Sequence, residues 1–318
     1  MGYITNFPDG IMASPLIGGG SEYAGWFGTN VWFVDGDNGN DSNPGTSTEP
    51  FATIQAGIDA AGAQDTVYIR TLAPDADASE PGTYEEDLTI AYAKHGLKLI
   101  GVTANGALGS FGGPKIKNAT AVALLTVNAS DVHIENLQFN CTRNSGTYGI
   151  RLRGISGYAT LAGSVGAHIV NCYIKNASST YGGISVYGGY HTLISRCTFG
   201  LGDDALGINL DCNSLPNNSH TIEYCNFKSN NGASVALHMS LENSKDFNVD
   251  HCNFDQATKF ITVVDGATGM ISNCTFNSGS TAVTADSTGK VEIPAACDEV
   301  GVAGCYGGDG TLVDAAGS

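Results

Sequence analysis

The chain has 318 residues, of which 43 are glycine and 14% are charged, and its 14 basic and 31 acidic residues give a net charge of −17 at pH 7. A surface this acidic repels phosphate backbones and anionic lipid headgroups, which excludes nucleic acid and membrane as expected partners. The glycine content, together with 42% hydrophobic residues, favours a core of many short elements joined by tight turns over one of long helices.

The first 30 residues are rich in glycine and do not share the repeat found later in the chain. Apolar and aromatic residues are scattered through them: Phe7, Ile11, Leu16, Trp26 and Phe27. Two interpretations stay open, an extended arm that orders against a partner protein and a tail with little fixed structure. The segment lacks the basic and apolar regions of a secretory signal, and no apolar run has membrane-spanning length, so we expect synthesis in the cytoplasm with reduced thiols.

Residues 51–61 have the apolar spacing of a short amphipathic helix. Its apolar face would consist of Phe51, Ile54, Ile58 and Ala61. Ser47 or Thr48 can cap its start, and Pro50 suits the first turn. Such a helix is suited to closing the end of a stack of strands, which would otherwise expose an unpaired edge. Short strands are then predicted near Val67, Leu88, Leu97 and Leu124.

Between Val132 and Asn277 the chain contains six copies of one short motif, with three apolar columns. The first column is Ile134, Ile169, Ile194, Ile222, Val249 and Ile271. The second is Leu137, Cys172, Cys197, Cys225, Cys252 and Cys274. The third is Phe139, Ile174, Phe199, Phe227, Phe254 and Phe276. The second and third columns are two residues apart, as on one face of a strand, whereas the first and second are three apart, which requires a one-residue bend between two strands.

The residue before the second column is expected to make that bend. The residues at this place are Asn136, Asn171, Arg196, Tyr224, His251 and Asn273. Asparagine is the residue other than glycine that best tolerates a left-handed backbone. A second apolar motif follows each first one, and its leading residues are Ile150, Ile184, Ile208, Val235, Ile261 and Val283. The spacings of the two motifs rise and fall together, as a single coil of about 20–30 residues requires.

These patterns predict an all-β fold, a right-handed parallel β-helix with a short N-terminal capping helix. We divide the chain into an N-terminal arm (1–30), the β-helix with its N-terminal cap (31–290), and a C-terminal cap or tail (291–318). Helical and leucine-rich repeats need a helix in every unit, and an antiparallel sandwich would not keep the same columns in register over six units.

The segment VWFVDGDNGNDSNPGTSTEPFATIQAGIDAAGAQDTVYIR (31–70), followed by GTYEEDLTI, resembles the N-terminal cap of pectate-lyase-like β-helix proteins. With the later I-x-x-C-x-F motifs, the resemblance covers residues 31–285. It implies the fold but not an activity, because proteins of this kind include lyases, hydrolases, epimerases and structural adhesins or spikes.

The opening YITNFPDGI, the glycine-rich arm and the cap together resemble virion-associated β-helix proteins of tailed bacteriophages. That resemblance implies a homotrimer whose arms attach to a capsid or tail protein, in a particle assembled in the host cytoplasm without a signal peptide. We therefore expect a virion structural protein, either a capsid decoration protein or a spike or fibre. It would stabilise the particle or bind the host surface, and we do not expect it to be an enzyme.

Asp203 and Asp204 are the strongest catalytic candidates. Paired carboxylates can act as general acid and base toward a sugar, or bind Ca²⁺. The pair resembles that of polygalacturonase-type hydrolases, but the accompanying NTD and GHG motifs are absent from this chain. An ordinary polar turn is the alternative, because another copy has Asn230 and Asn231 at this place. If the protein is an enzyme, these residues predict a polysaccharide lyase or glycoside hydrolase.

Asp35, Asp37 and Asp41 have the alternating spacing of ligands in a calcium loop, so Ca²⁺ is the only cofactor that this sequence suggests. The glycine and the glutamate of the full calcium-binding pattern are missing, which favours side chains that hydrogen-bond within a turn.

Three tyrosines, Tyr181, Tyr187 and Tyr190, are candidates for a carbohydrate-binding flank, which would make the protein an adhesin without turnover. The thiols of the second column occur one per copy, without the C-x-x-C spacing of zinc sites, so we expect them to pack inside the coil. Whether Cys297 and Cys305 pair depends on the redox compartment and stays open.

Overall fold

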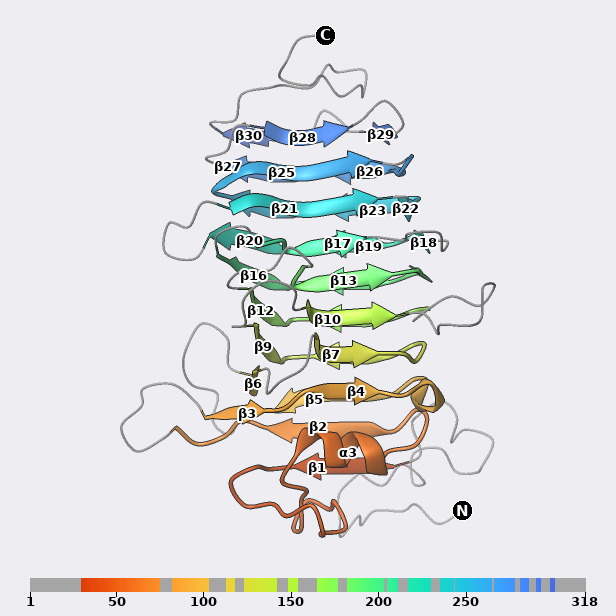
Figure 1. The fold of residues 1–318 in the computed structure, drawn as a ribbon, viewed down its shortest axis with the longest axis vertical. Helices are drawn as coiled ribbons and strands as arrows, with labels where there is room; N and C mark the ends of the chain where they lie inside the picture. The colour runs from red at the N-terminus through yellow and green to blue at the C-terminus, as the bar shows by residue number, and fades with distance from the viewer. Residues whose placement is uncertain are drawn as a thin grey trace, which may run out of the picture.

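The computed structural model describes residues 30–74, 82–102, 113–117, 123–141, 148–153, 165–176, 182–202, 205–210, 217–229, 235–242, 244–264, 266–277, 281–285, 290–292 and 298–300. Its strands stack as successive coils along one long axis, and helix α3 (Ile54–Ala60) lies at the N-terminal end of the stack (Figure 1). A short 3-10 helix, η1 (Tyr92–Lys94), precedes the third coil. Within the described ranges, no helix has the length and apolar character needed to cross a membrane.

The strands form three long parallel sheets, which we name A, B and C. From residue 66 to residue 285 the chain visits them in that order in each coil. Sheet A consists of β1 (Val31–Val34), β2 (Thr66–Arg70), β5 (Lys98–Val102), β8 (His133–Glu135), β11 (His168–Val170), β15 (Leu193–Ser195), β19 (Thr221–Glu223), β23 (Phe247–Asp250), β26 (Thr268–Ser272) and β29 (Lys290–Glu292). Sheet B consists of β3 (Thr83–Glu85), β6 (Lys115–Lys117), β9 (Gln138–Cys141), β12 (Tyr173–Asn176), β16 (Thr198–Leu201), β20 (Asn226–Ser229), β24 (Asn253–Asp255), β27 (Thr275–Asn277) and β30 (Asp298–Val300).

Sheet C closes the coil. It consists of β4 (Leu88–Ile90), β7 (Ala123–Val127), β10 (Tyr148–Arg153), β13 (Ile184–Tyr187), β17 (Ile208–Leu210), β21 (Val235–Glu242), β25 (Ala257–Val264) and β28 (Thr281–Ala285). A small sheet D, at the turn from C back to A, contains β14 (Gly189–Tyr190), β18 (Asn217–Asn218) and β22 (Ser244–Lys245). The predicted parallel β-helix and its early strands near Val67, Leu88, Leu97 and Leu124 are therefore confirmed.

The predicted columns lie in exact hydrogen-bonding register. In sheet A, Ile169 pairs with both Ile134 and Ile194, and the register continues to Ile271. In sheet B, Phe139, Ile174 and Phe199 pair in the same way. These columns are fully buried, so alternate residues of every strand face one shared interior.

Every predicted bend residue has a left-handed backbone, with φ between 49° and 57° at the six positions from Asn136 to Asn273. A second set of left-handed residues, at the turn into sheet A, was not predicted. It consists of Gln64, Gly96, Asp131, Gly166, His191, Ser219, Asp246 and Gly266. Their side chains share no chemistry, so no column marked them in the sequence, although most of these residue types tolerate this backbone.

The interior is organised as continuous stacks. The rings of Phe199 and Phe227 lie 4.5 Å apart and nearly parallel, and the stack continues through Phe254 to Phe276. The cysteines of the second column are buried free thiols, as predicted. Burial raises the pKa of the neighbouring Cys141 thiol to about 12, because the charged thiolate would lose its hydration. The thiols therefore act as small apolar side chains in the core.

Two predictions about local structure were wrong. Helix α3 begins after Thr53, whose side chain accepts a hydrogen bond from Ala56 N, so neither Ser47 nor Thr48 is its cap. In sheet C, the residue in register with Ile208 and Ile261 is Met239 and not Val235. In the segment SVALHMSL, the stretch that begins at Val235 and the stretch that begins at Met239 both alternate between apolar and other residues. The length of the preceding loop decides which of the two stretches pairs with Ile208.

Candidate binding face on sheet C

The outward column of sheet C holds polar side chains directly above one another. In register order these are Thr89, Thr126, Arg151, Ser185, Asn209, Ser240 and Thr262. Each follows an inward Ile, Leu or Met by one position, so strand alternation directs it away from the core. Seven neighbouring strands hold this column, which gives the face a rigid geometry.

Arg151 is placed between two aromatic rings on this face. Its guanidinium carbon lies 4.7 Å from the ring centroid of Tyr148 on the same strand and 6.0 Å from that of Tyr187 on the next coil. Tyr187 is itself in register with Arg153. These distances allow cation–π attraction, which orients the Arg151 side chain and places its charge within a partly apolar setting.

The same part of the face contains polar atoms that are buried but unpaired. Arg151 Nε and Asn209 Oδ1 have no hydrogen-bond partner among the described residues, although both atoms are shielded from solvent. Ser185, which lies between them in register, is 1% exposed. An unpaired buried donor or acceptor costs about 1–3 kcal/mol, and a ligand that supplies both an acceptor and a hydroxyl donor would recover that cost.

One described carboxylate, Glu242, neighbours this column. Ser240 Oγ donates a hydrogen bond of 3.0 Å to Glu242 Oε1. Acid–base hydrolysis of a glycoside needs two carboxyl groups on opposite sides of the bond. Among the described residues the face therefore offers binding groups, a cation and two aromatic rings, but not a pair of carboxylates.

Several predicted site residues lie outside the described residues. These are Asp203, Asp204, Tyr181, Cys297, Cys305 and the arm residues Phe7, Ile11, Leu16, Trp26 and Phe27. Of the tyrosines that are described, Tyr187 takes part in the face, whereas Tyr190 lies in β14 of sheet D with its ring 6.5 Å from that of His191.

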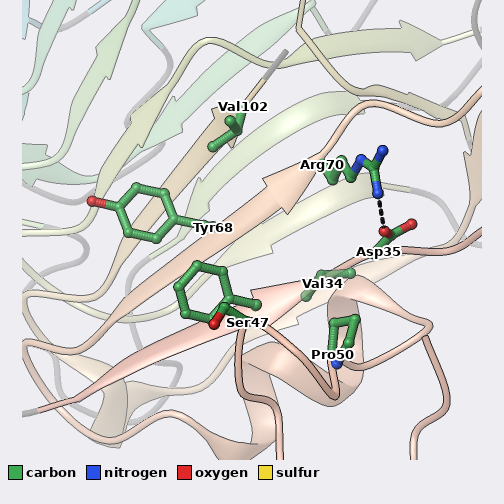
Figure 2. Close-up of a pocket in the computed structure, with 8 residues that line it drawn as sticks. Val34, Asp35, Ser47, Pro50, Tyr68, Arg70 and Val102 are labelled. Atoms are coloured by element: carbon green, nitrogen blue, oxygen red, sulfur yellow. Dashed lines mark hydrogen bonds and ion pairs between the residues drawn. The ribbon is translucent and has the colours of Figure 1, made fainter. Parts of the chain in front are cut away.

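The structure assigns Asp35, Asp37 and Asp41 to three different contacts in the cap. Asp35 accepts hydrogen bonds from Asn38 and forms an ion pair with Arg70, 2.5 Å from Nη1 to Oδ2 (Figure 2). Partial burial raises the pKa of Asp35, but the hydrogen bonds from Asn38 and Arg70 outweigh this and hold it below its usual value.

The other two carboxylates hold backbone amides. Asp37 Oδ2 accepts from Ala73 N, and Asp41 accepts from Ala52 N, Thr53 N and Thr53 Oγ1. Within the described part of the chain, no group of three His, Cys, Asp or Glu side chains could hold a metal ion. The loop thus uses its carboxylates as hydrogen-bond acceptors, and Ca²⁺ binding stays a prediction.

On sheet A, Asp250, His251 and Ser272 lie close together. Ser272 Oγ and His251 Nδ1 both contact Asp250, at 2.7 and 2.6 Å, so the serine hydroxyl is oriented by the carboxylate and not by the imidazole. Desolvation raises the pKa of Asp250, but hydrogen bonds from Ser272, Asn273 and His251 outweigh it and lower the pKa. This arrangement does not activate a nucleophile, which would need the base beside the hydroxyl.

Sequence reasoning missed Arg151, Tyr148 and Asn209. The available signal was the position after each leading Ile of the second motif, in GIRL, GISV and GINL, where a polar residue faces outward. That Tyr148 and Tyr187 flank the arginine depends on the stacking of two coils, which no spacing within one motif reveals.

A family model described as "Right handed beta helix region" matches residues 100–296. Among solved structures, the chain is similar to "Rhamnogalacturonan lyase", with 14% identity, a TM-score of 0.56, and 82% of this chain and 75% of that chain covered. It is also similar to XylC in complex with xylose, with 10% identity, a TM-score of 0.52, and coverage of 83% and 71%.

A third similar structure is ORF18 of Geobacillus virus E2, with 16% identity, a TM-score of 0.47, and coverage of 80% of this chain and 60% of that chain. No curated protein matches the chain. The low identities mean that these likenesses extend to the fold alone. Because the family model covers more than half of the sequence and the strands form three parallel sheets around one core, the chain belongs to the right-handed β-helix family.

Proposed function

We propose that this protein is a host-surface-binding β-helix of a tailed-phage particle, a spike or capsid decoration protein that holds a glycan without cleaving it. The observation that carries the proposal is Arg151 between the rings of Tyr148 and Tyr187, with the unpaired Oδ1 of Asn209 two coils away on the same column. Aromatic faces suit the apolar face of a sugar ring, while the guanidinium and the amide suit its carboxylate or hydroxyl groups.

The charge of the molecule supports a local and selective contact. The chain has a net charge of −17, yet β10 presents two arginines, Arg151 and Arg153, on the outer side of sheet C. An acidic glycan would be repelled by most of the surface and attracted here, which favours one binding place over diffuse adsorption. Binding is therefore expected to depend on ionic strength.

The virion part of the proposal rests on the resemblance of the opening, the arm and the cap to phage-particle β-helix proteins. In this proposal three copies assemble, residues 1–30 attach them to a capsid or tail protein, and the coils project outward. Mass spectrometry should then detect this chain in purified particles. The isolated protein in solution should have the mass of a trimer. A chain that is monomeric and absent from every particle would contradict this part.

Glycan binding is tested by titration calorimetry against host capsule and polyuronate fragments. Arg151→Ala should weaken binding at least tenfold, which corresponds to about 1.4 kcal/mol. Tyr92→Ala is the matched control, because Tyr92 is an exposed aromatic residue on η1, outside sheet C, and its loss should leave the affinity unchanged. Equal affinity for the Arg151→Ala variant and the wild type would reject the face on sheet C as the binding site.

A polysaccharide lyase or glycoside hydrolase is the second candidate. Two similar solved structures with TM-scores above 0.5 are named for a rhamnogalacturonan lyase and for XylC with xylose. In the sequence, Asp203 and Asp204 precede β17, the strand that carries Asn209. Incubation with the same glycans separates the candidates. Steady product release that Asp204→Asn abolishes would establish the enzyme, whereas binding without product would support the adhesin.

A further inference from the structure

The outer side of sheet A changes character along the stack. In its first three coils the residues in register are Phe33, Tyr68 and Ile100, and the column then continues with Glu135 in the fourth. The later coils place polar side chains such as Glu223 and Asp250 at the same position. The cap therefore presents a continuous apolar column to the outside, whereas at this position the coils from Glu135 to Ser272 present polar groups with the exception of Val170.

A hollow of about 390 Å³ lies on this column. Its walls include Phe33, Tyr68, Val102 and Pro50, and the paired side chains of Asp35 and Arg70 lie at one side (Figure 2). The rings of Phe33 and Tyr68 are 5.8 Å apart and tilted, and Val102 is 42% exposed. An open apolar hollow of this size has room for aromatic side chains and is costly to leave in water.

We propose that this hollow is the docking site for residues 22–29 of the same chain, with Trp26 and Phe27 as the inserted side chains. The segment ends where β1 begins, and the hollow is reached from Asn30 within three residues along that strand, about 10 Å. Trp26 precedes Asn30 by four residues, which span up to about 13 Å when extended, so a reversal of the chain brings the indole over Phe33. Gly28 and Asn30 are residue types that allow such a reversal.

Charge agrees with this occupant. The charged side chains of residues 1–29 are Asp9 and Glu22, and both are acidic. Arg70 lines the hollow with its side chain half exposed, and its ion pair with Asp35 leaves this rim close to neutral. An acidic segment is therefore repelled less here than over most of this acidic surface. Docking of residues 22–29 would leave Phe7, Ile11 and Leu16 available to a partner. The docking does not depend on whether sheet C binds a glycan.

The test uses the fluorescence of Trp26 in the full-length protein. The chain has two tryptophans, so subtracting the emission of Trp26→Phe from that of the wild type isolates Trp26. Docking predicts a blue-shifted Trp26 emission that acrylamide quenches several-fold less than in the urea-unfolded chain. A Trp26 signal equal to that of the unfolded chain would overturn the proposal.

Two variants locate the contact. Val102→Asp adds a charge to the hollow at an exposed position and should shift the Trp26 emission toward the unfolded value with unchanged circular dichroism. Tyr92→Asp, at a residue that is 64% exposed and does not line the hollow, is the matched control and should change nothing. Equal Trp26 signals for Val102→Asp and wild type would place Trp26 elsewhere. Loss of shielding on dilution would assign the hollow to the arm of a second copy and would also overturn docking within one chain.

Discussion

The cap and the later coils provide hydrogen-bond acceptors for the backbone N–H groups of their turns in different ways. In the later coils the bends from Asn136 to His251 donate their N–H groups to the next coil, as Asn171 N does to Ser195 O and Arg196 N to Glu223 O. In the cap, side-chain carboxylates accept the hydrogen bonds of backbone N–H groups. Asp65, which is fully buried, accepts from Asn30 N, Gly62 N and Trp32 Nε1, and Glu86 accepts from Ile54 N and Gln55 N at the start of α3.

The difference follows from position in the stack. A coil in the middle has a neighbour on both sides, so the repetition itself supplies a partner for each backbone group. The first coil lacks one neighbour, and its edge strand β1 is instead paired with the loop before α3, through Phe33 N to Gly45 O and Phe51 N to Phe33 O. A stack of strands therefore needs dedicated acidic side chains and a covering loop at its end, where exposed edges would otherwise invite aggregation.

The largest expected effect is a loss of stability at low pH that begins in the later coils before it begins in the cap. Burial lowers the pKa of His220 to about 4 and that of His238 to about 3, both in the later coils. The unfolded chain protonates these histidines near pH 6.5, whereas the folded chain does not, so stability is full above pH 6.5 and falls as the pH drops toward 4. The loss at pH 4 should be about 3 kcal/mol for each histidine.

Asp35 in the cap behaves differently, because its lowered pKa keeps its contribution until the pH falls below about 3.8. Hydrogen exchange at pH 5 should therefore accelerate in the later coils before it does in the cap. His238→Phe, which copies Phe260 in register one coil later, should halve the slope of unfolding free energy against pH. An unchanged slope in that variant would show that His238 does not carry the effect, and exposed His251→Gln is the control.

The next effect is a cavity in the phenylalanine stack. Phe227 lies between Phe199 and Phe254 at 4.5 and 4.7 Å, and it is fully buried. Phe227→Ala should lower the free energy of unfolding by about 3–5 kcal/mol, because the neighbouring strands are too tightly paired to collapse into the space. Urea denaturation measures it, and Tyr92→Ala on the exposed 3-10 helix should change stability by less than about 0.5 kcal/mol.

A smaller effect is expected in the cap from Asp65→Asn. The amide keeps one acceptor but turns an NH₂ group toward Gly62 N or Trp32 Nε1, which leaves a buried donor unpaired. The expected cost is about 2–3 kcal/mol in thermal or urea unfolding. A cost near zero would mean that the carboxylate does not hold the end of the stack.

The smallest effect concerns the bends. Arg196 is exposed and has φ of 54°, at the place where three other coils have asparagine. Arg196→Asn should raise the free energy of unfolding by up to about 1 kcal/mol, since asparagine tolerates this backbone better. Arg153→Asn, on an exposed strand position, is the comparison and should not stabilise. A decrease for Arg196→Asn would indicate that the arginine side chain makes a contact of its own.

Much of the fold was readable from the sequence, because a β-helix repeats local rules. The Ile, Cys and Phe columns and the Asn-type bends each depend on neighbours within a few residues, and they were confirmed together with the right-handed β-helix fold. The place of Met239 was not readable, since the length of an irregular loop decides which of two equivalent stretches enters the core.

The sequence alone determined the coil, its inward residues and the need for an N-terminal cap, since alternation and backbone preference act between near neighbours in the chain. Only the tertiary structure decided which polar side chains meet. Arg151 gains Tyr187 from the next coil, Asp65 gathers donors from two segments, and Phe33, Tyr68 and Val102 form a hollow across three coils. Such contacts depend on the register between coils, and that register is set by the summed lengths of the loops and by the packing of the whole stack.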